Sequence, residues 1–304
     1  MTGRRYCFRA FLTAVLTAVL TAVLAGCGGG SDTPASVIDS GPDTGQIVIA
    51  LTDAEGDFSS YTVTVESIVL ERLDGTAVET LPMRTEVDFA ELTEVTELVT
   101  IATVPAGRYQ GAILRLDYSD AMVVVQEPDG NLHDALVRDE AGNPIGSLDV
   151  RLELTETDQI VIRPGVPAAF SLDFDLDASN EIDFSAAPPI VTVRPFLLAA
   201  AELEADRAHR LRGLLDGVDE AEGVVTIDMR PFRHRRGNFG SMSFAVDAET
   251  LYEIDGNSYV GSEGIAALAD LAAADGAIPV IAGGFVEEGG LSARTVLAGS
   301  SVPW

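Results

Sequence analysis

Most of the chain consists of short segments in which apolar and polar residues alternate. Ile47–Leu51 is a short apolar run that predicts a strand, and Tyr61–Val65 follows it with β-branched residues and the two-residue period of a strand. Asp74-Gly75 is a typical tight-turn pair. Similar segments are Ile68–Leu70, Glu86–Phe89, Leu98–Ile101, Tyr109–Asp117, Ala121–Gln126, Leu148–Leu154, Gln159–Ile162, Ala169–Leu176 and Ile190–Leu198. Many short strands separated by turn residues predict a β-sandwich over residues 46–199.

The alternation restarts after residues 199–211, which we expect to form a short helical or irregular connector. Strands are predicted at Arg212–Leu215, Val224–Met229, Ser241–Val246, Leu251–Ile254, Ile278–Phe285 and Leu291–Leu297. Ser262–Ala274 places Ile265, Leu268 and Leu271 at the spacing of an amphipathic helix. Glu287–Gly290 has the composition of a hairpin turn. The fold class is therefore all-β, with a small C-terminal β-barrel and one helix over residues 210–299.

The first 26 residues have the pattern of a secretory signal peptide. Three arginines and no acid precede the mostly apolar run Ala10–Ala25, which is shorter than the roughly 20 residues of a membrane-spanning helix. The run ends in Leu24-Ala25-Gly26-Cys27, which resembles the lipobox of bacterial lipoproteins. That resemblance implies cleavage before Cys27 and a diacylglyceryl group on its thiol, usually followed by acylation of the new amino terminus. Two or more acyl chains give stable attachment to a membrane.

Residues 27–45 join the predicted anchor to the first strand. They are rich in glycine, serine, aspartate, threonine and proline, a composition typical of a flexible linker. Gly28 does not resemble an inner-membrane retention signal, so the outer membrane is the favoured destination. We therefore expect an exported protein, lipid-anchored in the bacterial cell envelope.

Charge and cysteine content narrow the range of partners. The chain has 19 basic and 48 acidic residues, and loss of residues 1–26 changes the formal charge from −29 to −32. Such a charge argues against DNA, RNA or anionic lipid as a partner, because each is itself negative. Cys7 leaves with the signal and Cys27 is predicted to be lipidated. No thiol then remains for a disulfide, a metal site or catalysis.

Two stretches resemble bacterial families of unknown function. Leu51–Asp57, Val63–Val65, Val87–Phe89, Val104–Tyr109 and Leu172–Asp175 are similar to domain-of-unknown-function family 4382, over about residues 46–199. Glu55 departs from that family, which commonly has proline there. Phe244–Thr250, Leu268–Leu271 and Leu291–Val296 resemble domain-of-unknown-function family 5666, over about residues 210–299. The resemblances imply a sandwich followed by a small barrel, with no established activity and no catalytic residue.

An acidic run is the clearest candidate for an ion site. Asp173, Asp175 and Asp177 offer the oxygen ligands that Ca²⁺ prefers, and Asn180, Glu181 and Asp183 follow them. A standard EF-hand is excluded, because Ala178 stands where its glycine is required and Phe184 where its last ligand is required. The alternative is a strand with one apolar and one acidic face. Asp53, Glu55 and Asp57 either join the same site or form a turn.

The only basic cluster is Arg230, Arg233, His234, Arg235 and Arg236. Arg233, Arg235 and Arg236 are candidates for contact with an anionic envelope polymer or with the acidic first domain, and a solvated loop is the alternative. His133, His209 and His234 show no metal-binding spacing. Serine-hydrolase, phosphate-binding and dinucleotide-binding motifs are absent from the sequence.

Three functions remain open. The first is an envelope-tethered, non-enzymatic binding or structural module, with no cofactor and an unknown protein or glycan partner. The second is an adhesion module stabilised by Ca²⁺. The third is a polysaccharide hydrolase with an unrecognised carboxylate pair, since such enzymes need two acids and the chain has 48.

Overall fold

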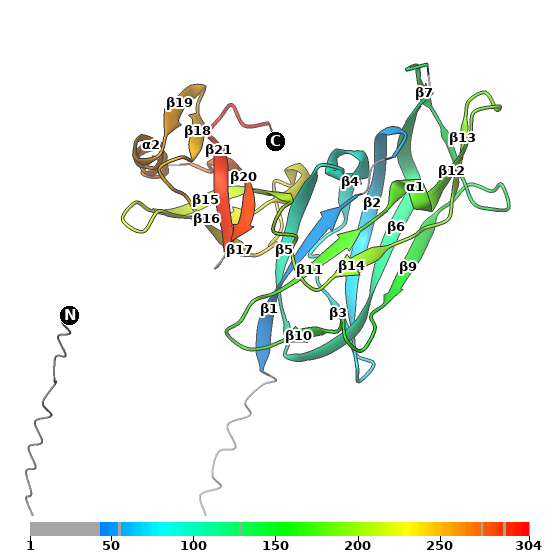
Figure 1. The fold of residues 1–304 in the computed structure, drawn as a ribbon, viewed down its shortest axis with the longest axis horizontal. Coiled ribbons are helices and arrows are strands. Elements are labelled where there is room, and N and C mark those ends of the chain that lie inside the picture. The colour runs from blue at the N-terminus through cyan, green and yellow to red at the C-terminus, as the bar shows by residue number, and fades with distance from the viewer. Residues whose placement is uncertain (1–42, 54–55, 128, 275, 288–289, 304) are drawn as a thin grey trace, which may run out of the picture. The chain divides into compact units, whose positions relative to one another are not determined.

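The structure is a computed structural model that describes residues 43–53, 56–127, 129–274, 276–287 and 290–303 (Figure 1). Strands account for 57% of the described residues, which contain two α-helices, α1 (Leu176–Ser179) and α2 (Ser262–Ala272). The all-β prediction is confirmed, and α2 forms where the amphipathic spacing predicts it. No helix in these ranges is long and apolar enough to cross a membrane. The predicted signal peptide, Cys27 and the linker up to residue 42 lie outside the described residues.

The N-terminal part, residues 44–200, contains two large sheets. Its strands are β1 (Thr44–Thr52), β2 (Phe58–Arg72), β3 (Ala77–Glu79), β4 (Thr85–Asp88), β5 (Val95–Pro105), β6 (Gly107–Gln126), β7 (Leu132–Asp134), β8 (Leu136–Arg138), β9 (Ser147–Glu153), β10 (Ile160–Ile162), β11 (Ala168–Asp173), β12 (Asn180–Asp183), β13 (Ile190–Val193) and β14 (Leu198–Ala200). One sheet runs β14-β11-β1-β5, with β1 parallel to β11 and antiparallel to β5. The other is built on β2 and β6, and β3, β4, β7, β9 and β10 extend it. β12, β13 and β8 form a small third sheet.

The hydrophobic core of this part follows from the alternation in its strands. Ala112, Leu114 and Leu116 are alternate residues of β6, and all three are fully buried. Ile47 and Ile49 of β1 belong to the same buried cluster. Successive side chains of a strand point to opposite faces, so a two-residue apolar period gives each sheet one face for the core.

One long strand replaces two that the sequence predicts. Tyr109–Asp117 and Ala121–Gln126 form the single strand β6, although Ser119 and Asp120 have the composition of a turn. The register against β2 shifts at this point, because Thr62 is opposite Met122 whereas Thr64 is opposite Asp117. A bulge therefore takes up the extra residues, and the chain stays extended.

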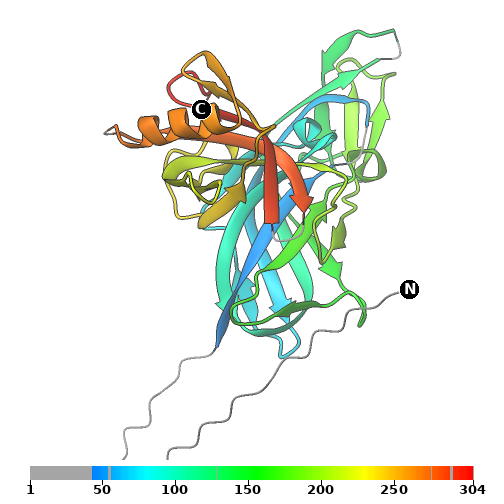
Figure 2. The same ribbon diagram turned by 60° about the vertical axis from the view of Figure 1, so that its left-hand side comes forward.

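The C-terminal part, residues 208–303, forms a closed ring of strands. It contains β15 (Ala208–Asp219), β16 (Val224–Met229), β17 (Ser241–Ala245), β18 (Leu251–Ile254), β19 (Asn257–Val260), β20 (Pro279–Glu287) and β21 (Gly290–Ala298). Pairing runs β15-β16-β17-β21-β20 and returns to β15, while β18 and β19 extend β21. Pairing of β20 with β21 confirms the predicted hairpin. Helix α2, orange in Figure 2, packs against β15, β18 and β19.

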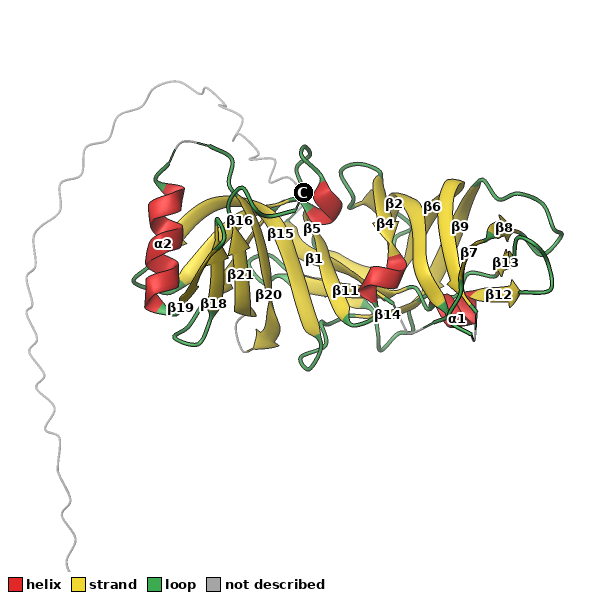
Figure 3. Cartoon of the chain, turned by 90° about the horizontal axis from the view of Figure 1, so that it is seen from above, coloured by secondary structure: helices red, strands yellow, loops and turns green. Residues whose placement is uncertain are grey.

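The two parts share one sheet. Residues 208–210 of β15 pair in parallel with residues 95–97 of β5, so β15, β5, β1 and β11 lie side by side (Figure 3). The predicted connector at 199–211 is not helical: β14 ends at Ala200, and β15 begins at Ala208. The sheet therefore continues from one part into the other.

Replacing Gly213 with alanine should lower the free energy of unfolding by about 1–3 kcal/mol, the usual cost of overpacking. A Cβ atom on Gly213 of β15 would lie 2.2 Å from the Asp228 carbonyl oxygen, a backbone atom with no room to move. Gly217 is the control, since it lies on the same strand and a Cβ there would meet nothing within 4 Å. Urea unfolding should separate the two variants, and equal midpoints would contradict the close approach of β15 and β16.

Candidate binding site

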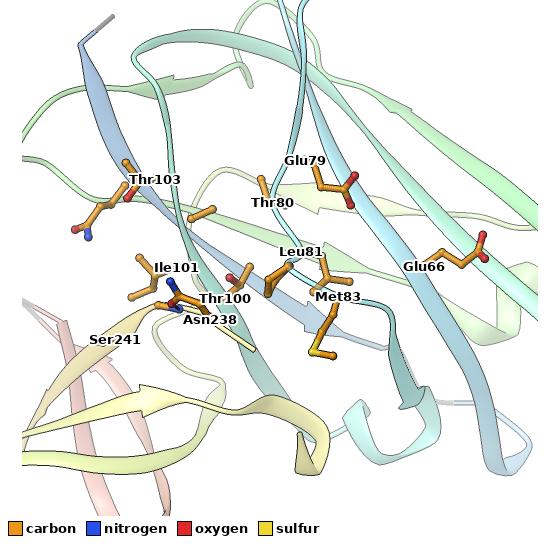
Figure 4. A pocket seen from close by; sticks show the side chains of 14 residues that line it. Glu66, Glu79, Thr80, Leu81, Met83, Thr100, Ile101, Thr103, Asn238 and Ser241 are labelled. Atoms are coloured by element: carbon orange, nitrogen blue, oxygen red, sulfur yellow. Dashed lines mark hydrogen bonds between the residues drawn. The ribbon is translucent and has the colours of Figure 1, made fainter. Parts of the chain in front are cut away.

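A pocket of about 660 Å³ opens beside the sheet edge formed by β5. We call it the flank pocket. It is lined by Gln46, Glu66, Glu79, Thr80, Leu81, Pro82, Met83, Thr100, Ile101, Ala102, Thr103, Asn238, Gly240 and Ser241. Glu66 on β2 and Glu79 on β3 lie across from Thr103 on β5 (Figure 4). Its volume is in the range of small-ligand sites.

Two hydroxyl groups of the flank pocket donate hydrogen bonds to backbone oxygens and so stabilise the fold. Thr80 Oγ1 donates to the Ile68 carbonyl oxygen at 2.8 Å, and Thr100 Oγ1 donates to the Phe239 carbonyl oxygen at 3.0 Å. Each of these two hydroxyl protons is therefore already used in a hydrogen bond to a backbone oxygen.

The titratable groups of the flank pocket are both carboxylates. Partial burial raises the pKa of Glu79, and Arg115 acts in the opposite direction. Glu66 accepts a hydrogen bond from Ser147 Oγ at 3.1 Å. The Arg115 guanidinium is itself held by Asp149, with two N–O distances of 2.6 and 2.8 Å. The lining therefore contains two carboxyl groups and no basic side chain.

Backbone groups of β5 also face the pocket. The Ile101 N–H points away from β1 and donates to the Phe239 carbonyl oxygen at 2.7 Å. Residues two apart on an antiparallel strand direct their N–H and C=O groups to the same side. Thr103 is exposed and has β1 as its only paired neighbour among the described strands, so its N–H and C=O face the pocket.

A buried ion pair holds β5 against β15 next to the pocket. Glu97 is 0% exposed and contacts the Arg210 guanidinium, and its Oε1 atom lies 3.2 Å from Arg212 Nε. Burial raises the pKa of Glu97, and Arg212 and Arg210 act against that shift. Nearby, Arg207 donates to the Leu92 carbonyl oxygen at 2.7 Å and to the Asp53 carbonyl oxygen at 3.1 Å. Arg207, which precedes β15, and Arg210 and Arg212 of β15 thus all bind the N-terminal part.

A loop from the C-terminal part completes this contact. Phe239 is 0% exposed, and its ring stacks on His234 with centroids 5.1 Å apart. His234 Nε2 lies 2.9 Å from Thr85 Oγ1 of β4. Asn238, Gly240 and Ser241 flank Phe239 and line the flank pocket. We call the contact formed by Glu97, Arg210, Arg212, His234 and Phe239 the seam.

The three aspartates predicted to bind Ca²⁺ have separate environments. β11 ends at Asp173, whose pKa is raised by burial, by Asp175 and by Glu204, with Arg207 opposing. Asp175 caps α1 by accepting from the Ala178 N–H at 2.8 Å, and Asp177 is exposed on the helix. The predicted strand Ala169–Leu176 therefore stops early. Among the described residues no group of three or more His, Cys, Asp or Glu is arranged to hold a metal ion.

The residues of the second acidic run, Asp53, Glu55 and Asp57, do not form one site among the described residues. Asp53 is buried and accepts a hydrogen bond from the Leu176 N–H at 3.0 Å. Asp57 is exposed, and Glu55 lies outside the described residues. Asp53 therefore joins β1 to the start of α1.

Some residues of the basic cluster contact the backbone, and others face solvent. Arg230 donates to the Met229 carbonyl oxygen at 2.7 Å. Arg235 and Arg236 are exposed, and neither forms an ion pair with a described residue. The Arg233 side chain lies outside those described. Contact of this loop with the N-terminal part is made by His234 and Phe239, and the predicted anion contact stays a prediction.

Sequence reasoning did not find the flank pocket or the seam. Glu97 interrupts an apolar strand, and Arg210 and Arg212 share one face of another strand. The sequences of both strands therefore contained a sign of buried charge. Glu66, Glu79 and Thr103 carried none, because they resemble ordinary solvent-facing strand residues.

Comparison with known proteins bears on the N-terminal part. No curated protein and no solved structure matches the chain. The resemblance of residues 210–299 to a second family stays a prediction, as does the lipoprotein anchor. The family model described as "Domain of unknown function (DUF4382)" matches residues 44–183, so this segment of the chain is a DUF4382 domain.

Proposed function

We propose that the chain is an envelope-tethered lipoprotein that acts as a non-enzymatic binding module. Its ligand is an extended, positively charged polypeptide segment that enters the flank pocket. The observation that carries the proposal is the pairing of an open strand edge at Thr103 with two carboxylates, Glu66 and Glu79, in one pocket. A strand edge supplies main-chain hydrogen bonds to an added segment, and pockets beside it select side chains.

Charge supports a cationic ligand. The formal charge of −29 attracts cations over long range and speeds their encounter with the protein. Inside the pocket, Glu66 and Glu79 can bind a guanidinium or ammonium group, because an ionised carboxylate accepts hydrogen bonds and donates none. The hydroxyls of Thr80 and Thr100 are already bonded to backbone oxygens.

The anchor is tested in a bacterium that processes lipoproteins. The full chain should incorporate a labelled fatty acid and fractionate with membranes, and Cys27→Ser should abolish both, because the thiol is the site of lipid attachment. A Cys27→Ser protein that still carries the label would contradict the assignment of Cys27.

Binding is tested with a fluorescent peptide of alternating arginine and valine and the mature Cys27→Ser chain. Glu66→Gln with Glu79→Gln should weaken binding about ten-fold, equivalent to ~1.4 kcal/mol. Glu253→Gln with Glu263→Gln is the control, since both residues are exposed and far along the chain and the charge change is equal. A peptide methylated on its backbone nitrogens keeps its charge but cannot pair as a strand. Equal binding of both peptides, equal losses in both double variants, or turnover of an envelope polysaccharide by the chain would contradict the proposal.

A further inference from the structure

One end of the N-terminal part combines exposed apolar side chains with unpaired arginines. Leu73, Val161 and Val166 are 50%, 36% and 59% exposed. Arg108 and Arg163 are exposed, and neither forms an ion pair with a described residue. Isolated exposed apolar residues are ordinary, but a cluster with cations around it is a feature of interaction sites.

Strand pairing and backbone hydrogen bonds show that these five residues are neighbours. Val161 of β10 is the cross-strand partner of Arg108 on β6, which puts their side chains on one face of the sheet. The Arg108 carbonyl oxygen accepts from the Leu73 N–H at 3.1 Å. Arg163 and Val166 form an isolated bridge just beyond β10. We call these five residues the tether face.

The chain enters the fold at this same end. The carbonyl oxygen of Asp43, the first described residue, accepts from the Ala106 N–H at 2.7 Å. Gly45 lies against the Arg163 carbonyl oxygen. Figure 1 shows the start of β1 together with β3 and β10 at the lower end of the N-terminal part, and β7 at its upper end. Residues 28–43 separate Cys27 from β1, so Thr44 lies at most about 60 Å from the anchor.

One acidic group beside the tether face, Asp74, is neutralised by an ion pair. Asp74 pairs with Arg72 at 2.7 Å, and Arg72 also donates to the Ala106 carbonyl oxygen. Because the chain as a whole is strongly negative, a membrane surface repels most of it. The face that carries Arg108 and Arg163 beside apolar side chains is the one that a phosphate-bearing surface tolerates.

We propose that the tether face docks on the bilayer that holds the Cys27 lipid. Leu73, Val161 and Val166 enter the headgroup region, and Arg108 and Arg163 bind lipid phosphates. Docking rests on the proposed anchor, and it fixes the orientation of the domain so that β7 points away from the membrane.

The test uses the lipidated mature chain in vesicles of phosphatidylethanolamine and phosphatidylglycerol. Single cysteines replace Leu73 or Val166 and carry an environment-sensitive fluorophore, and Leu132→Cys is the control, because Leu132 is 56% exposed on β7 at the opposite end. Labels at 73 and 166 should shift to shorter emission wavelengths and be quenched by a spin-labelled lipid, whereas the label at 132 should do neither.

A second pair of variants tests the arginines. With the label at 73, Arg108→Glu with Arg163→Glu should remove the shift and the quenching. Arg235→Glu with Arg236→Glu carries the same charge change on exposed residues elsewhere and should leave both unchanged. An anchored chain whose labels at 73 and 166 behave like the label at 132 would overturn docking alone. A Cys27 thiol that reacts with maleimide in the mature chain would overturn the anchor and docking together.

Discussion

Replacing Glu97 with alanine will lower the free energy of unfolding by about 3–5 kcal/mol, because it removes the fully buried carboxylate that pairs with two partly buried arginines. Glu97 is 0% exposed, while the side chains of Arg210 and Arg212 are 22% and 12% exposed. The measurement is urea unfolding of the mature Cys27→Ser chain, followed by a probe in each part. Since the pair joins β5 to β15, both parts should lose stability together.

Glu91 supplies the matched control. It lies 3.9 Å from Arg210 and 4.0 Å from Arg212, but its side chain is 55% exposed. Solvent screens such a pair, so Glu91→Ala should cost about 0–1 kcal/mol. Replacing Glu97, Arg210 and Arg212 together with leucine, methionine and leucine should recover most of the loss, as buried ion pairs often contribute little beyond an apolar contact. A Glu97→Ala loss no larger than that of Glu91→Ala would show that water reaches the seam.

The parts of the fold that depend on local sequence were predictable. Helix α2 needs only the spacing of Ile265, Leu268 and Leu271 and forms where expected. The alternation in β2, which buries one face, and the continuous apolar run in β1, which is buried on both faces from Ile47 onward, likewise identify strands. Periodicity does not encode which edge of a strand is paired, and that is the information that defines the flank pocket and the seam.

Two strand boundaries were predicted wrongly, because side-chain hydrogen bonding and strand pairing compete with the apolar–polar period. Asp173, Asp175 and Asp177 alternate with apolar residues like one acidic strand face, but the Asp175 side chain accepts from the Ala178 N–H and starts a helix. Aspartate favours such caps over continued strand. In β6 the reverse occurs, since Ser119 and Asp120 are typical of a turn but a bulge keeps them in the strand. In both cases the structure is decided by a hydrogen-bonding partner, the Ala178 N–H or strand β2, that the apolar–polar alternation of the segment does not identify.

Glu97 illustrates why the seam was missed. Its partners on β15 are more than a hundred residues away in sequence, and an acid inside an apolar run is also typical of a strand end. The predicted strand Leu98–Ile101 accordingly starts one residue too late to include it, whereas β5 begins at Val95. Only the parallel pairing of β5 with β15 shows that the acid is interior.

Replacing Phe239 with alanine should cost about 3–5 kcal/mol of unfolding free energy, since it empties a fully buried aromatic site. The ring stacks on His234, and the backbone carbonyl accepts from the Ile101 N–H at 2.7 Å. Phe285→Ala is the control, because Phe285 is 36% exposed on β20 and should cost much less.

Phe239 also links stability to binding. Asn238, Gly240 and Ser241 form one wall of the flank pocket, and Phe239 holds that wall against β5. Under conditions where Phe239→Ala is still folded, the arginine–valine peptide should therefore bind more weakly than it binds Phe285→Ala. Loss of stability with unchanged peptide binding would mean that Glu66, Glu79 and the Thr103 edge hold the ligand without the C-terminal part. Loss of both would mean that the DUF4382 domain binds its ligand only together with the segment that follows it.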